Sequence, residues 1–257
     1  MHRTRYSACI VALALLITIF AVPVHASTQP SIPINGRFST LVIKISIPTS
    51  PAWAHDVVLN ATVAWNLAQL WQNSADPVYT FVEANDGSAT AKVSYQMPTA
   101  YAGIAVGWTN YNFEPNSRTS IKATQTYLDP SVFNEGQANN STARQLAFWL
   151  ATHELGRVLG LGSILGSHDI MDPMASPARL DAPMLSTLDL YAVHVLASGS
   201  APAFVTLPDN LQNQMVDART FLGHGQPPTP VPEFNGYYGI IATICTMGAL
   251  LTKRRKK

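Results

Sequence analysis

The segment ATHELGRVLGLGSILGSHDIMDPM, Ala151 to Met174, places a His-Glu pair inside a helical pattern. Residues 139–142 offer polar capping side chains where this helix would begin. Gly160 is suited to end it, because glycine readily adopts a left-handed turn. The segment therefore predicts a helix that carries His153 and Glu154, followed by a loop rich in glycine.

Hydrolysis by a zinc ion on a helix requires two imidazoles one turn apart and a carboxylate beside the first. His153 and Glu154 supply one ligand and the general base. The position one turn later holds Arg157, whose guanidinium has only donors and stays charged. In a site built for a dication, this guanidinium could pair with Glu154 or another acid and keep the site neutral.

The segment resembles the matrixin branch of the metzincin zinc metallopeptidases, whose pattern is H-E-x-x-H-x-x-G-x-x-H followed by a methionine turn. His153, Glu154, Gly160 and Met171 match that pattern, and the resemblance extends over roughly residues 40–197. It implies that His153 is a zinc ligand, that Glu154 is the catalytic base and that Met171 forms the turn beneath the metal.

Two ligand positions of the pattern hold other residues: Arg157 replaces the second histidine, and Ser163, at best a weak ligand, replaces the third. The resemblance therefore implies impaired or lost peptide-bond hydrolysis, with zinc as a cofactor only if the chain is active. One alternative is that His168 and Asp169 approach His153 as substitute ligands. The other is a non-catalytic module that binds a peptide or protein.

Periodicity predicts an α+β domain, because strands and helices are interspersed along the chain. The resemblance adds a metzincin-like twisted mixed sheet backed by helices, with an active-site helix and a Met-turn. It also implies that residues 101–111 are the cleft strand to which a peptide adds edge to edge. The predicted strands are 40–48, 78–84, 91–97, 102–108 and 120–128, and the helices are 55–71, the one containing His153, and 185–196.

The two ends of the chain carry patterns of export and anchoring. Residues 1–26 combine basic residues, an apolar run from Ala8 to Val22 and a small-residue cleavage site, which predicts a signal peptide. An uncleaved anchor fits less well, because this run has 15 residues and a span needs about 20. At the other end, an apolar stretch precedes basic residues 253–257, so both ends point to the cytoplasm and the middle lies outside.

The tripeptide Pro232-Glu233-Phe234 resembles archaeal sorting signals, in which a membrane transpeptidase cuts near the motif and attaches the protein to an anchor. The resemblance implies an archaeosortase-like processing enzyme as a partner and a membrane anchor, on the extracellular face of the cell envelope. A permanent short transmembrane anchor remains the alternative. The predicted organisation is a signal peptide at 1–26, a matrixin-like domain at 27–200, a connector and Pro-rich linker at 201–232, and a sorting signal at 233–257.

Composition narrows the partners of the exported part. Cys9 and Cys245 both lie in the terminal apolar segments, so no disulfide is available to the domain between them. Residues 27–230 contain 9 Lys and Arg against 14 Asp and Glu, a net charge of −5. A mildly acidic domain argues against a nucleic-acid partner, which requires a basic face.

Overall fold

A computed structural model describes residues 30–72, 78–103, 105–165, 167–173 and 183–223. The predicted signal peptide, the Pro-rich part of the linker from residue 224 and the sorting signal lie outside the described residues, as does Met174. Within them, no helix has the length and apolar character needed to cross a membrane.

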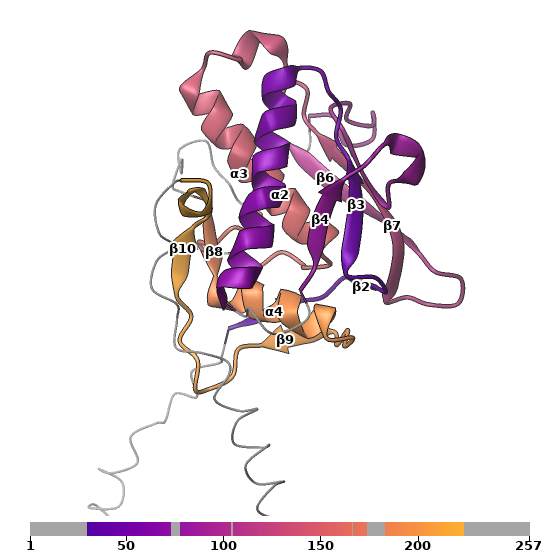
Figure 1. The fold of residues 1–257 in the computed structure, drawn as a ribbon, viewed down its shortest axis with the longest axis vertical. Helices are drawn as coiled ribbons and strands as arrows, with labels where there is room; N and C mark the ends of the chain where they lie inside the picture. The colour runs from indigo at the N-terminus through magenta and orange to yellow at the C-terminus, as the bar shows by residue number, and fades with distance from the viewer. Residues whose placement is uncertain (1–29, 73–77, 104, 166, 174–182, 224–257) are drawn as a thin grey trace, which may run out of the picture.

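The central sheet is mixed, with five parallel strands and one antiparallel strand (Figure 1). The parallel strands run in the order β2-β7-β5-β3-β4, and β6 pairs with β7 in the antiparallel direction. Their bounds are β2 (Arg37–Phe38), β3 (Val42–Ser46), β4 (Thr80–Glu83), β5 (Ala91–Ser94), β6 (Gly107–Phe113) and β7 (Ser120–Leu128).

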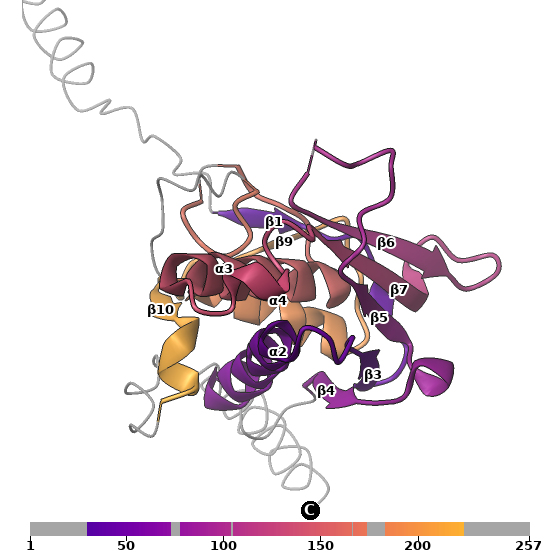
Figure 2. The ribbon, with the colours of Figure 1, turned by 90° about the horizontal axis from the view of Figure 1, so that it is seen from above.

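Three helices lie on one side of this sheet (Figure 2). They are α2 (Ala52–Gln72), α3 (Ser141–Val158) and α4 (Thr187–Ala197), and α2 and α3 lie side by side. Two small sheets complete the domain: β1 (Ser31–Pro33) with β9 (Phe204–Thr206), and β8 (Met184–Ser186) with β10 (Met215–Asp217). Short 3-10 turns occupy Asp86–Ser88, Glu135–Gln137 and Ala218–Phe221. The α+β class predicted from the sequence is confirmed.

Two segments differ from the sequence prediction. The strand expected over 102–108 is wrong in its bounds, since β6 begins at Gly107 and runs through asparagines that favour turns. Residues 201–223, assigned above to a connector, pack onto the domain: β9 pairs with β1, and Phe221 is buried. The pairing of such three-residue strands depends on distant partners, which local periodicity does not show.

The packing of α2 against α3 is centred on Gly156. Trp65, fully buried on α2, donates its indole N–H to the carbonyl of Thr152 on α3 at 2.9 Å. A Cβ atom at Gly156 would lie 2.9 Å from the Trp65 ring and 2.6 Å from the Met171 sulfur. Glycine is thus required here because two large side chains contact the helix backbone directly.

Gly160 follows α3 and turns the chain at a second close contact. Its φ of +102° is a conformation that side-chain-bearing residues rarely adopt, and an added Cβ would collide with the backbone carbonyl of Gly36. The backbone N–H of Asn35 donates to the Gly160 carbonyl at 2.8 Å. This turn joins the end of α3 to the segment that leads into β2.

The two edges of the central sheet differ. At β4, the side-chain amide of Asn66 donates to the Phe81 carbonyl at 3.0 Å and accepts the Phe81 N–H at 2.9 Å, which blocks that edge. At β6, the backbone N–H of Asp129 donates to the carbonyl of Val106, so Val106 faces the partner strand. In an antiparallel pair only every second residue directs its backbone groups at the partner strand. The backbone groups of Gly107, Thr109 and Tyr111 then point away from β7, and no other described residue hydrogen-bonds to them through its backbone.

We predict that Gly160→Ala lowers the free energy of unfolding much more than Gly199→Ala. Both glycines have positive φ, +102° and +98°, but Gly199 has nothing within 4 Å of an added Cβ. The backbone conformation alone costs about 1 kcal/mol in each variant, and the collision with Gly36 should add about 2 kcal/mol or more at position 160. Urea denaturation of both variants measures the difference, and equal losses would contradict the proposed contact.

Candidate functional site

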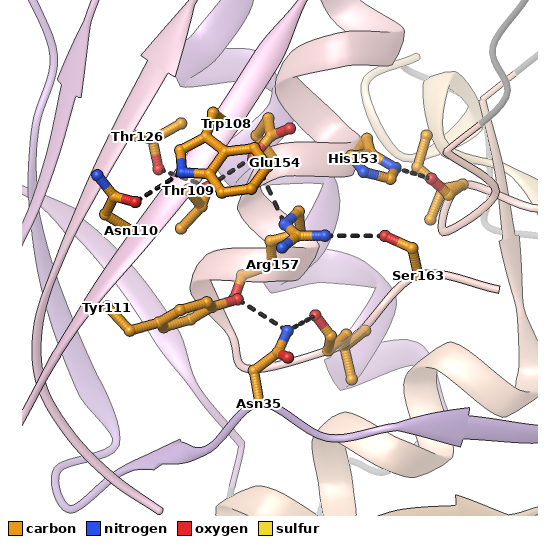
Figure 3. A network of polar contacts seen from close by, with 12 residues as sticks. Asn35, Trp108, Thr109, Asn110, Tyr111, Thr126, His153, Glu154, Arg157 and Ser163 are labelled. Carbon is orange, nitrogen blue, oxygen red and sulfur yellow. Dashed lines mark hydrogen bonds and ion pairs between the residues drawn. The ribbon is translucent and has the colours of Figure 1, made fainter. Parts of the chain in front are cut away.

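Glu154 is held between α3 and β6. Its carboxylate is buried, and the Thr109 hydroxyl donates to Oε2 at 2.6 Å (Figure 3). The Thr109 oxygen in turn lies 3.1 Å from the Thr126 hydroxyl on β7. The side chain predicted to be a general base is therefore tied to the sheet by a short hydrogen bond.

Gly107 lets β6 approach Glu154 closely. A Cβ atom at this position would lie 2.7 Å from Glu154 Oε1 and 2.9 Å from Leu150 Cδ1, so a side chain here would displace Glu154 or Leu150. The first residue of β6 thereby sets the distance between the strand and the helix. Glu154 is confined from one side by this backbone and from another by Thr109.

Arg157 and Ser163, which stand where the matrixin pattern has its second and third histidines, are in direct contact. Its Nη1 donates to the Ser163 hydroxyl at 2.8 Å, and its Nε lies 3.9 Å from Glu154 Oε2 (Figure 3). The Arg157 side chain is 21% exposed, and that of Glu154 is 4% exposed. The guanidinium thus lies between a buried carboxylate and a hydroxyl, with part of its surface reaching solvent.

The backbone at Arg157 is fixed by an aromatic residue of β6. The Tyr111 hydroxyl donates to the Arg157 carbonyl at 2.8 Å and accepts from the Asn35 amide at 3.0 Å. Burial raises the pKa of Tyr111 to about 12, so the hydroxyl keeps its proton at neutral pH. Asn35 also donates to the Leu161 carbonyl at 2.8 Å, which ties β6 to the chain after α3 (Figure 3).

His153 keeps a defined tautomer. Its Nδ1 lies 2.7 Å from the Ile170 carbonyl, which can only accept, so Nδ1 carries the proton. The ring stacks on Trp149 with a centroid separation of 5.3 Å. Burial lowers the pKa of His153, so the ring is neutral at pH 7 and Nε2 carries a lone pair instead of a proton.

Side chains of the loop after Ser163 form hydrogen bonds that hold the turn at Met171. Met171 is fully buried beneath α3 at Gly156. The Asp169 carboxylate is also buried and accepts from the Ser167 hydroxyl at 2.6 Å and from the Met171 N–H at 3.0 Å. His168 has a positive φ of 60°, and its backbone N–H lies 3.4 Å from the Asp172 carboxylate.

The structure brings some of the predicted site residues together and not others. His153, Glu154, Arg157 and Ser163 share one region between β6 and the loop, whereas Asp169 is engaged in the Met171 turn. Among the described residues, no group of three or more His, Cys, Asp or Glu side chains could hold a metal ion. The substitution of ligands by His168 and Asp169 therefore remains a prediction.

Sequence reasoning missed the residues that hold this site from other elements. Thr109, Thr126 and Asn35 have common side chains and no motif that marks them. Gly107 and Tyr111 lie in the segment predicted to be a cleft strand, but no sequence motif indicated their contacts with Glu154 and Arg157. Their task is to position Glu154 and Arg157, and it depends on contacts between residues far apart in the chain.

A second buried polar cluster lies below the site, where Asp169 approaches Asp189 of α4. Asp189 is fully buried and accepts the Ser186 N–H at 2.9 Å in a capping box. Burial, and then repulsion from Asp169, raise the pKa of Asp189, and burial also raises the pKa of Asp169. Asp169 Oδ2 and Asp189 Oδ1 have no hydrogen-bond partner among the described residues.

Comparisons with known proteins do not place the chain in a family. No known family and no curated protein matches it. Among solved structures, the chain is similar to one from "GM1 bound form of the ECX AB5 holotoxin", with 12% sequence identity and a TM-score of 0.37. That match covers 67% of this chain and 92% of the other, and at this TM-score it supports no conclusion about function.

We predict that the pair Asp169 and Asp189 makes the domain more stable as the pH falls from neutral toward 4. A carboxyl whose pKa in the folded state lies above the unfolded value of 3.8 binds its proton more tightly when folded. Its stabilising contribution is complete below that unfolded pKa and is lost as the pH rises through the folded pKa. Thermal unfolding between pH 4 and 8 measures this trend.

The matched variant for this test is Asp189→Asn. Its amide oxygen can still accept the Ser186 N–H, but the side chain cannot ionise. We expect its melting temperature at pH 7.5 to equal or exceed that of the wild type and its pH dependence to be weaker. Asp209→Asn, at an exposed position, serves as the control and should leave the profile unchanged. An unchanged profile in Asp189→Asn would contradict the assignment.

We predict that Arg157 and Glu154 stabilise the fold jointly. Arg157→Leu leaves the buried Glu154 carboxylate without its nearby cation and should cost about 1–3 kcal/mol of unfolding free energy. In a Glu154→Gln background the same change should cost about 1 kcal/mol less, because no charge is left uncompensated. A double-mutant cycle by urea denaturation gives the coupling, and strictly additive losses would show that the pair does not interact.

Proposed function

We propose that this domain is a matrixin-like member of the metzincin zinc metallopeptidases that has lost peptide-bond hydrolysis and binds peptides instead. Support comes from the sequence pattern around His153 and from the burial of Met171 beneath the helix that carries it. The mixed sheet, with an antiparallel strand next to that helix, is consistent with the proposal.

The contacts of Arg157 carry the proposal. A zinc site requires unprotonated donors, and an arginine side chain offers only N–H groups and a positive charge. The guanidinium donates to Ser163 and lies beside Glu154, so it engages the residue at the third ligand position and stands close to the base. The residues present at this site do not fit a zinc ion.

The free edge of β6 provides the binding surface. The outward backbone groups of Gly107, Thr109 and Tyr111 can pair with an extended peptide, as in other cases of strand addition. The side chains of Thr109 and Tyr111 leave the sheet on the face that carries the helices, where they hydrogen-bond to α3. The strand is therefore held rigidly by contacts that a peptide on its outer edge would not disturb.

Retained hydrolysis is the second candidate, and His153 is the observation that favours it. Its Nδ1–H donates to the Ile170 carbonyl, and this kind of hydrogen bond orients a histidine whose Nε2 binds a metal. Glu154 also remains in place beside it. One imidazole and a nearby cation should nonetheless bind zinc far more weakly than three imidazoles do.

The proposal extends to export and surface anchoring. Both rest on the terminal segments, which lie outside the described residues.

We predict that the purified chain contains no stoichiometric zinc and does not cut casein above the background of a Glu154→Ala variant. Elemental analysis and a fluorescent casein assay measure the two quantities. One zinc per chain, or hydrolysis that disappears in Glu154→Ala, would establish the enzyme and refute the proposal.

The double variant Arg157→His with Ser163→His tests whether the scaffold keeps the geometry of the family. Because His153 and Glu154 are already in place, we expect this variant to gain zinc in proportion to the protein. Arg144→His with Ser141→His, placed near the start of the same helix, is the matched control and should gain none.

A further inference from the structure

We propose that Arg157 and Ser163 bind the C-terminal carboxylate of a peptide that lies along β6. The inference rests on the proposed function, because it names the class of peptide that the site would select. The ligand is then a peptide that ends at the site, rather than one that passes through it as a protease substrate does.

The donors that remain at the site suit a carboxylate. Arg157 uses one Nη1 hydrogen on Ser163, while its Nε lies near Glu154. The other Nη1 and Nη2 hydrogens have no hydrogen-bond acceptor among the described residues. A guanidinium presents such hydrogens as a planar fork that matches the two oxygens of a carboxylate.

Ser163 adds a second donor beside the first. Its oxygen accepts from Arg157, and none of the described residues accepts its hydroxyl hydrogen, which can therefore donate to a ligand. Because the two side chains are in direct contact at 2.8 Å, a single small acidic group can reach both. An unmodified peptide carbonyl has one oxygen and no charge, and it would use this arrangement only in part.

The charges around Arg157 also permit an anion to bind. Glu154 is the nearest competing carboxylate, but it is 4% exposed and directed into the sheet by the Thr109 hydroxyl. The 3.9 Å separation between Arg157 Nε and Glu154 Oε2 is longer than a hydrogen bond. Arginine can bridge two carboxylates because its donors lie on different edges of the guanidinium.

The position of Arg157 relative to β6 completes the inference. The Tyr111 hydroxyl binds the Arg157 backbone carbonyl, so this turn of α3 is fixed at the level of Tyr111 in the strand. Figure 3 shows the guanidinium between the strand that carries Tyr111 and the segment that carries Ser163. A peptide paired with the outer edge of β6 would therefore have Arg157 beside its main chain.

The test compares two synthetic hexapeptide libraries with the same random sequences, one ending in a free carboxylate and the other in an amide. Each is equilibrated with the purified full chain, and the bound fraction is measured by affinity selection and mass spectrometry. We expect the acids to bind about tenfold more tightly than the amides, the effect of one charge-assisted hydrogen-bonded contact. Acetate at the same concentration should not compete, because it has no main chain to pair with β6.

Variants assign the preference to these residues. Arg157→Gln should remove it, Ser163→Ala should reduce it a few-fold, and Arg144→Gln on the same helix should leave it intact. Ser163→Ala removes the hydroxyl without leaving a charge unpaired, so we expect this variant to fold. It therefore tests the inference even if Arg157→Gln does not fold.

The outcomes separate this inference from the proposed function. Equal binding of acids and amides would overturn the carboxylate assignment and leave peptide binding standing. A preference that persists in both Arg157→Gln and Ser163→Ala, or efficient competition by acetate, would overturn it too. Failure of both libraries to bind would refute the proposed function itself.

Discussion

The close contact of Trp65 and Met171 with the backbone of α3 at Gly156 fixes the helix on which the candidate site is built. With no side chain at that position, an indole and a thioether both pack against the same face of the helix. The contacts leave little freedom for rotation of the helix about its axis. His153, Glu154 and Arg157 share that helix, so their directions relative to β6 follow from the packing beneath them.

Within that frame, the arginine works as an internal counter-ion. A carboxylate that is buried and hydrogen-bonded by one threonine still needs a nearby positive charge, and Arg157 supplies it from within the chain. Zinc would bring two positive charges and would have to be acquired from solution. With one covalently attached charge, the site is close to neutral as it folds.

The sequence predicted the class of the fold, the main helices and the central strands because their apolar periodicity is strong. It also identified Arg157 and Ser163 as the residues that depart from the pattern. It did not predict that they would hydrogen-bond to each other, nor the role of Thr109, because both depend on how β6 meets α3. The short strands β1, β9, β8 and β10 were missed for a similar reason: each is defined by a partner far away in the chain.

The blocked edge at β4 has a consequence for assembly. Asn66 occupies both backbone groups of Phe81, so a neighbouring molecule cannot continue the central sheet from that side. Among the described residues, copies of the domain could extend the central sheet through the outer edge of β6, edge against the same edge. Such a contact is a two-fold pair, and the central sheet cannot continue beyond it because β4 is blocked on the far side.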